Sequence, residues 1–242
     1  MHVKIDGVIV EVQPGMTILQ AAKEIGIEIP TLCYLEGVHE LGVCRVCVVE
    51  VKGAKTLMPA CITKVADGME IYTHTARVRR ARRTVLELIL SDHPDECLTC
   101  SKNNNCELQK LAIEMNIQQK SYEGEHAARV IDHESPALIR DSAKCILCRR
   151  CLTVCSQIQD VWAIAPIGRG FKTVIAPAGK DSLMESPCVQ CGQCANVCPT
   201  GAITEKNDIA KVWKALEDPE LHTVVQVAPA VRVAIGEVFD LE

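Results

Sequence analysis

The chain opens with short runs in which β-branched and polar residues alternate. Two such runs within residues 3–12 flank Asp6-Gly7, a dipeptide that favours a tight hairpin turn. Residues 17–25 are typical of a helix that ends at Gly26. Further short strands are predicted over 48–51, 55–58 and 69–73. The first third of the chain therefore predicts a small mixed fold of short strands and one helix.

Five arginines fall within residues 77–83, and apolar residues recur among and after them at helical spacing. The apolar positions are Val78, Ala81, Val85, Leu88 and Ile89. This pattern predicts an amphipathic helix whose arginines form a solvated or partner-facing flank. Nucleic-acid binding is disfavoured, because the net charge is −5.

The rest of the chain predicts a helix over 108–115, a polar connector over 116–133 and a long insertion before residue 188. His126 and His133 lie in the connector without ligand-like spacing, and we expect both at the surface. The insertion predicts a strand pair from residues 162–164 and 171–175. Residues 221–242 predict a strand, then Pro229, then a short helix, with apolar side chains exposed.

The candidate chemistry lies in fifteen cysteines. With His93 they make sixteen candidate ligands, enough for four sites of four with no cysteine left over. An odd count, repeated CxxC spacing and a start unlike a secretory signal argue against disulfides and predict a reducing, cytoplasmic setting. No apolar run is long enough to predict a membrane span. The ligands form four groups: Cys33, Cys44, Cys47 and Cys61; His93, Cys97, Cys100 and Cys106; Cys145, Cys148, Cys151 and Cys155; Cys188, Cys191, Cys194 and Cys198.

The first group has one CxxC with a single cysteine on either side. Four thiolates suit either a 2Fe–2S cluster or a structural zinc ion. Zinc sites usually use two CxxC pairs, so the spacing favours iron and sulfide. Zinc remains the alternative.

The last two groups are copies of CxxCxxCxxxC, the most specific signal in the chain. In bacterial two-cluster ferredoxins, the fourth cysteine of each run binds the cluster of the other run. Carried over here, one 4Fe–4S cluster takes Cys145, Cys148, Cys151 and Cys198, and the other takes Cys188, Cys191, Cys194 and Cys155. Pro199 follows the second run, whereas Ser156 follows the first; that proline is not a ligand, so the expected ligand sets stand.

Three longer motifs resemble known families. The segments PTLCY at 30–34 and GVCRVCVVEV at 42–51 resemble the β-grasp 2Fe–2S domain that opens FeFe-hydrogenases and the large subunit of respiratory complex I. The spacing HxxxCxxCxxxxxC, from His93 to Cys106, resembles the 4Fe–4S motif of one histidine and three cysteines in the same families. The segment VVQVAPAVRVAIGE at 224–237 resembles the start of the catalytic H-cluster domain of FeFe-hydrogenases.

The resemblance spans the chain and implies an α+β protein with one 2Fe–2S and three 4Fe–4S clusters. We expect a β-grasp 2Fe–2S domain at 1–78 and a small helical 4Fe–4S domain, ligated by His93 and three cysteines, at 79–135. A bacterial-type two-cluster ferredoxin domain follows at 136–220, and a docking tail at 221–242.

All candidate ligands are used by clusters, and no catalytic site is expected in this chain. The resemblance implies an electron-transfer subunit between a flavin-containing, NAD(P)-reactive subunit and a second oxidoreductase subunit or a soluble ferredoxin, as in anaerobic metabolism. The complex would be of the hydrogenase, formate dehydrogenase or flavin-based transhydrogenase type. Two alternatives stay open: an amino-terminal fragment of an FeFe-hydrogenase catalytic subunit, and a zinc-rich scaffold.

Overall fold

A computed structural model describes residues 1–179 and 182–239. The chain forms two compact units, one from Met1 to Lys206 and one that begins at Asn207. Each unit is described by itself.

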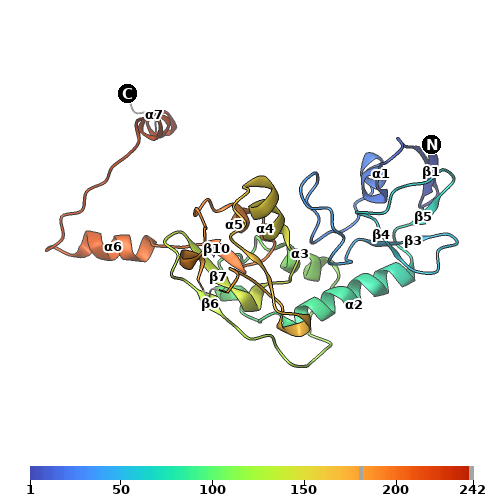
Figure 1. Ribbon diagram of the computed structural model, residues 1–242. Helices are drawn as coiled ribbons and strands as arrows, with labels where there is room; N and C mark the ends of the chain where they lie inside the picture. Colours follow the sequence, from blue (N-terminus) through green and yellow to red (C-terminus); the bar gives the residue numbers. More distant parts are fainter. Residues whose placement is uncertain (180–181, 240–242) are drawn as a thin grey trace. The chain divides into compact units, whose positions relative to one another are not determined.

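The amino-terminal part of the first unit is a five-stranded sheet in the order β2-β1-β5-β3-β4 (Figure 1). The predicted hairpin around Asp6-Gly7 is confirmed, with Ile5 paired to Val8. β1 and β5 run parallel, and the other neighbours are antiparallel. The strands are β1 (His2–Ile5), β2 (Val8–Glu11), β3 (Val48–Val51), β4 (Met58–Pro59) and β5 (Glu70–Tyr72).

Helix α1 (Ile18–Glu24) packs its apolar face into the core of this sheet. Its start is fixed by a capping box in which the Thr17 side chain accepts from the Gln20 backbone and the Gln20 side chain accepts from the Thr17 backbone. Ile18, with Ile5 and Ile71 of the sheet, is fully buried. The mixed fold predicted for this segment is therefore present.

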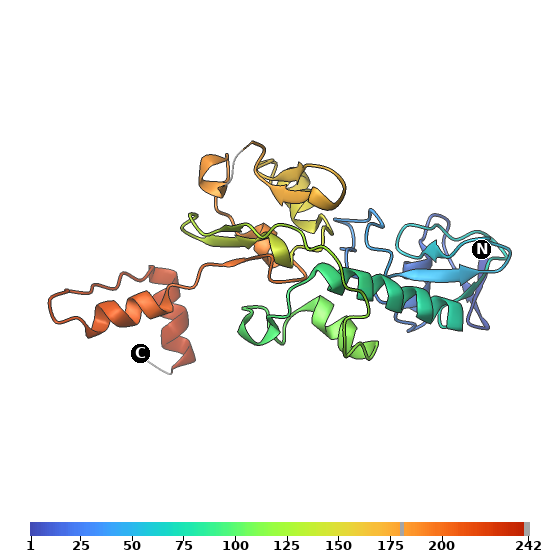
Figure 2. The same ribbon diagram turned by 90° about the horizontal axis from the view of Figure 1, so that it is seen from below.

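Helix α2 (Ala76–Asp92) runs alongside β3, as Figure 2 shows. The helix was predicted, but its buried face differs from the expectation. Leu86 is buried and Leu88 is 52% exposed, so the expected apolar stripe is wrong at Leu88. Arg82 is also buried, and its Nε and Nη2 donate to the Val48 carbonyl at 3.1 and 2.8 Å. This arginine is a structural donor rather than part of a solvated flank.

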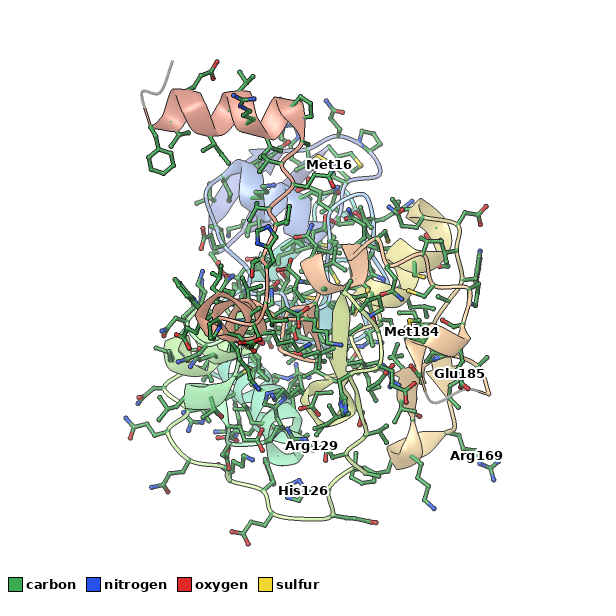
Figure 3. All side chains as sticks on the ribbon, turned by 90° about the vertical axis from the view of Figure 1, so that its left-hand side faces the viewer. Met16, His126, Arg129, Arg169, Met184 and Glu185 are labelled. Atoms are coloured by element: carbon green, nitrogen blue, oxygen red, sulfur yellow. The ribbon has the colours of Figure 1, made fainter. Side chains whose placement is uncertain are left out.

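Helix α3 (Glu107–Glu114) follows and packs Leu108 and Leu111 against Leu86. The connector after it exposes His126 and His133, as expected. Figure 3 shows His126 on an outward-facing loop. After His126, the connector enters a three-stranded sheet in the order β10-β7-β6. These strands are β6 (Ile131–Asp132), β7 (Leu138–Asp141) and β10 (Ile203–Glu205).

Each CxxCxxCxxxC run contains a short helix, α4 (Arg150–Thr153) in the first and α5 (Gln193–Asn196) in the second. After α4 the chain continues as a π-helical turn (Val154–Ile158). The strand pair predicted in the insertion is present, although its strands are β8 (Ala165–Ile167) and β9 (Val174–Ala176).

The second unit contains α6 (Ile209–Glu217) and α7 (Pro229–Val238). The predicted helix after Pro229 is confirmed, but the predicted strand is wrong, because residues 221–228 have no regular structure. Helix α6 was not predicted. No helix in the described ranges is long and apolar enough to cross a membrane.

Candidate iron–sulfur cluster sites

Three cavities of the first unit are each lined by one of the predicted ligand sets. The first cavity lies between the start of α4 and the turn after α5. Cys145, Cys148 and Cys151 come from one run, and Cys198 comes from the other. The structure thus brings the fourth cysteine of the second run to the first three of the first run.

The second cavity shows the reciprocal arrangement. Cys188, Cys191 and Cys194 line it together with Cys155, which lies in the π-helical turn. π-helical turns are rare and often occur at functional sites. The Ser156 hydroxyl donates to the Leu152 carbonyl at 2.8 Å within this continuing helix, at the position where the second run has Pro199.

The two runs repeat the same backbone as well as the same sequence spacing. Leu147 and Arg149 in the first run have left-handed φ values of 54° and 66°. Gln190 and Gly192, at the equivalent positions of the second run, have φ values of 57° and 75°. Left-handed turns of this kind leave backbone N–H groups pointing into a concavity, where they can bond to anionic sulfur.

The third cavity is lined by His93, Cys97, Cys100 and Cys106. His93 caps the end of α2, and its backbone carbonyl accepts from Lys120 Nζ at 2.5 Å. Burial lowers the pKa of His93, with Lys120 and Lys144 adding to the effect. A neutral imidazole is the form that binds metal.

The same cavity passes two tests of fit to a bound group. His93 Nδ1 is buried and has no hydrogen-bond partner among the described residues. Gly201 forms part of the wall, and a Cβ there would lie 2.7 Å from Cys100 Sγ. An orphaned nitrogen beside three thiols is what a metal–sulfur cluster would satisfy.

The four cysteines of the amino-terminal group lie in two pairs. Cys47 Sγ is 3.3 Å from Cys61 Sγ, and Cys33 Sγ accepts from the Cys44 backbone N–H at 3.4 Å. Hydrogen bonding within the pairs lowers the pKa of Cys33 and of Cys47 and raises that of their partners. Two pairs of thiols match the two iron atoms of a 2Fe–2S cluster.

Burial is the largest cause of the raised pKa of several thiols in the 4Fe–4S candidate sites. It raises the pKa of Cys145 to about 11 and of Cys148 and Cys194 to about 12. Bound metal reverses this tendency, because a coordinating thiol loses its proton. Among the described residues, no three His, Cys, Asp or Glu side chains form a site for a single metal ion.

The His93 cavity and the first cysteine cavity share a wall. Lys144 lines one, and its neighbour Cys145 lines the other. The Thr200 hydroxyl donates to the Lys144 carbonyl at 2.7 Å, and the Glu107 N–H donates to the Pro199 carbonyl at 3.0 Å. These bonds tie the turn after Cys198 to the loops of both cavities.

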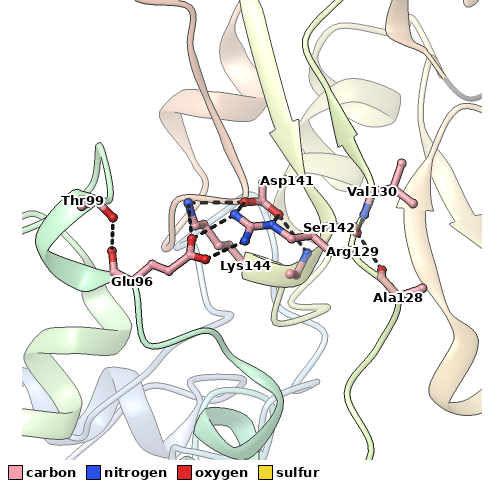
Figure 4. A network of polar contacts seen from close by, with 9 residues as sticks. Glu96, Thr99, Ala128, Arg129, Val130, Asp141, Ser142 and Lys144 are labelled. Atoms are coloured by element: carbon pink, nitrogen blue, oxygen red, sulfur yellow. Dashed lines mark hydrogen bonds and ion pairs between the residues drawn. The ribbon is translucent and has the colours of Figure 1, made fainter.

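A charged network, not found from the sequence, also joins these loops (Figure 4). Arg129 donates to both carboxylate oxygens of Glu96, at 2.6 and 2.9 Å, and to both of Asp141. Lys144 lies 3.3 Å from Asp141 and 3.8 Å from Glu96. Glu96 precedes Cys97 and Lys144 precedes Cys145, and charges beside ligand cysteines were the available signal.

Three family descriptions match successive parts of the chain. Residues 1–76 match a 2Fe-2S iron-sulfur cluster binding domain, and residues 82–121 match the NADH-ubiquinone oxidoreductase-G iron-sulfur binding region. Residues 144–202 match a 4Fe-4S dicluster domain. Both cluster types expected from the sequence are therefore represented.

Individual relatives agree with these matches. The chain is 47% identical to the NADP-reducing hydrogenase subunit HndD of Solidesulfovibrio fructosivorans, over 98% of this chain and 41% of that protein. It is 33% identical to iron hydrogenase 1 of Clostridium pasteurianum, over 98% of this chain and 42% of that protein. The chain thus spans about two fifths of the length of these two relatives.

A solved structure gives a more complete match. A chain in the crystal structure of NAD+-reducing [NiFe]-hydrogenase in the H2-reduced state superposes with a TM-score of 0.79 at 29% identity. The match covers 85% of this chain and 87% of that one. The chain therefore contains 2Fe-2S and 4Fe-4S iron–sulfur domain types and resembles hydrogenase subunits over nearly its whole length.

Proposed function

We propose that this chain is the iron–sulfur electron-transfer subunit of an NAD(P)-linked oxidoreductase complex. The observation that carries the proposal is the set of three cavities, each lined by one of the expected sets of four candidate ligands. When bound, the clusters would supply one-electron carriers at successive positions through the first unit.

In this proposal the chain holds one 2Fe–2S and three 4Fe–4S clusters. Cys33, Cys44, Cys47 and Cys61 hold the 2Fe–2S cluster, and the paired thiols support this assignment. The 4Fe–4S ligand sets are His93, Cys97, Cys100 and Cys106; Cys145, Cys148, Cys151 and Cys198; and Cys188, Cys191, Cys194 and Cys155. The supporting observation for each set is its shared cavity.

The protein's own residues would place and insulate these carriers. The sheet β2-β1-β5-β3-β4 and α1 support the amino-terminal thiols, and the apolar core around Leu138, Ile164 and Leu183 surrounds the two ferredoxin-like cavities. We retain the expected boundaries after residues 78, 135 and 220 as part of the proposal, since the matched family segments lie within them. The second compact unit begins before the last of these boundaries, at Asn207.

The partners in this proposal are a flavin-containing, NAD(P)-reactive subunit and a second oxidoreductase subunit or ferredoxin, in the cytoplasm. Support comes from the hydrogenase relatives named for reduction of NADP or NAD+. The second candidate is a fragment of an FeFe-hydrogenase catalytic subunit. Two hydrogenase relatives favour it, because they are longer and this chain covers only 41% and 42% of their lengths. The solved chain of similar size, 87% covered, favours the separate subunit.

Anaerobic purification from the native host tests the proposal. We expect a flavin-containing chain and a second oxidoreductase chain to co-purify, and NADH or NADPH to reduce the clusters of the complex. If the native polypeptide also carries an H-cluster domain, this result would instead support the hydrogenase fragment. A colourless protein rich in zinc would refute both.

A further inference from the structure

Arg150 lies between Cys148 and Cys151 in the first CxxCxxCxxxC run, and only 4% of its surface is exposed. Arginine stays charged in proteins and is almost never fully buried unless it is paired. The equivalent residue in the second run is Gln193, which is exposed. The ligand motif by itself therefore does not require a buried charge at this position.

The contacts of Arg150 reach two other ligand loops. Its Nη1 and Nη2 donate to Glu107 Oε1 and Oε2 at 2.5 and 2.8 Å, a bidentate ion pair. Its Nη2 also donates to the Tyr34 carbonyl at 3.1 Å. Glu107 directly follows Cys106, and Tyr34 directly follows Cys33. One guanidinium thus connects the candidate loops of three different clusters.

A second contact crosses the same junction. His39 is 1% exposed and lies in the loop between Cys33 and Cys44. Its Nδ1 is 2.5 Å from the Thr153 hydroxyl in α4. The loop that carries the amino-terminal thiols is therefore held to α4 at two points, and Arg150 is the charged one.

Arg150 does not border the cavity of its own run, whereas its neighbour Arg149 does. The two arginines therefore have different surroundings although they carry the same charge. Arg149 is exposed at one cavity, and Arg150 is buried among three ligand loops. A buried charge acts over longer distances than an exposed one, because water screens it less.

We propose that Arg150 is a positioning residue for electron transfer between clusters. Its guanidinium holds the loops of the Cys33, His93 and Cys145 ligand sets at fixed spacing and places one permanent positive charge among them. That charge favours the reduced form of these three clusters over the oxidised form. The inference rests on the proposed function, since it assigns a role between clusters that the chain is proposed to hold.

The test uses the full chain, loaded with clusters anaerobically, and EPR-monitored redox titration of each cluster. Arg150→Gln gives the first run the residue that the second run already has. We expect the reduction equilibrium constants of the three clusters to fall about tenfold, which is 59 mV for one electron. The cluster of Cys188, Cys191, Cys194 and Cys155 should keep its potential.

Three further variants separate charge from geometry. Glu107→Gln removes the opposite charge from a half-exposed side chain, so it should raise the same potentials rather than lower them. Arg150→Lys keeps the charge but not the bidentate geometry. The reduction potentials of the three clusters should therefore stay unchanged, while the magnetic coupling between the reduced clusters should weaken. Arg149→Gln is the matched control and should move only the cluster of Cys145.

The outcomes are distinct. Unchanged reduction potentials in both Arg150→Gln and Glu107→Gln would overturn the proposal. A shift of all three cluster potentials in Arg149→Gln would overturn it as well. A loss of the same clusters in both variants, without opposite shifts, would show a merely structural role. If Arg150→Gln does not fold, the upward shift in Glu107→Gln decides. A wild-type chain that binds no clusters would refute the proposed function instead.

Discussion

Arg129 Nη2 lies 2.7 Å from Asp141 Oδ2, and the same guanidinium holds Glu96 on its other side. Asp141 is buried at the end of β7, while Glu96 stands one residue before Cys97. Arg129 therefore joins the loop that carries His93 and Cys97 to β7, the strand that precedes the first cysteine run.

Replacing Arg129 with methionine should lower the urea midpoint of the first unit, because the buried Asp141 carboxylate loses its main donor while Lys144 remains. Urea unfolding of the cluster-loaded chain measures this. Lys23→Met is the matched control, since its ion pair with Glu36 is exposed on both sides and should contribute less than about 0.5 kcal/mol. Equal losses in both variants would argue against a structural role for the network.

Metal analysis of the anaerobically loaded chain should return about fourteen iron and fourteen sulfide, two for the 2Fe–2S cluster and four for each of three cubanes. A count of about ten iron atoms per chain would mean that one 4Fe–4S cluster is absent, and the His93 site would be the first to re-examine. Zinc in place of iron would contradict the cluster assignment.

His93→Cys should keep its cluster but lower its reduction potential, because a thiolate adds a negative charge where neutral imidazole has none. His93→Ala should weaken or lose that cluster alone. Redox titration with EPR detection follows both variants, and His126→Ala serves as the control at an exposed histidine. Unchanged EPR signals and potentials in His93→Ala would show that His93 is not a ligand.

Gly201→Ala should disturb the His93 cluster, because the added Cβ would lie 2.7 Å from Cys100 Sγ. We expect the EPR signal of that cluster to broaden or disappear. The matched control is Gly124→Ala, where a Cβ would have no atom within 4 Å. A normal spectrum in Gly201→Ala would mean that the cavity wall yields easily.

Deletion of residues 221–242 should release the partner subunit and leave the clusters intact, because every proposed ligand lies at or before Cys198. The second unit exposes large apolar side chains, which normally mark an interface. Val224 and Val225 are 76% and 78% exposed, and Val238 is 76% exposed. Pull-down and iron analysis of the truncated chain measure both effects. Loss of clusters with partner binding retained would place these residues in the chain's own core.

The second unit also shows where sequence patterns were insufficient. Helix α6 has its apolar residues Ile209, Val212, Trp213 and Leu216 at helical spacing, yet all four are exposed within the described chain. A stripe of this kind predicts burial only when the fold supplies a surface to cover it. The strand expected before Pro229 did not form, since a strand needs a neighbour for its backbone hydrogen bonds.

Sequence alone predicted the four runs of candidate ligands, because the spacing within each run is local. The hairpin at Asp6-Gly7 and the helix after Thr17 also follow from local patterns. The exchange of Cys155 and Cys198 between the runs was predicted from the pattern of two-cluster ferredoxins. Tertiary structure alone decided which charges are buried among these loops. Arg82, Arg150 and Asp141 look like ordinary surface residues in the sequence, and they are buried because distant segments supply their hydrogen-bond partners.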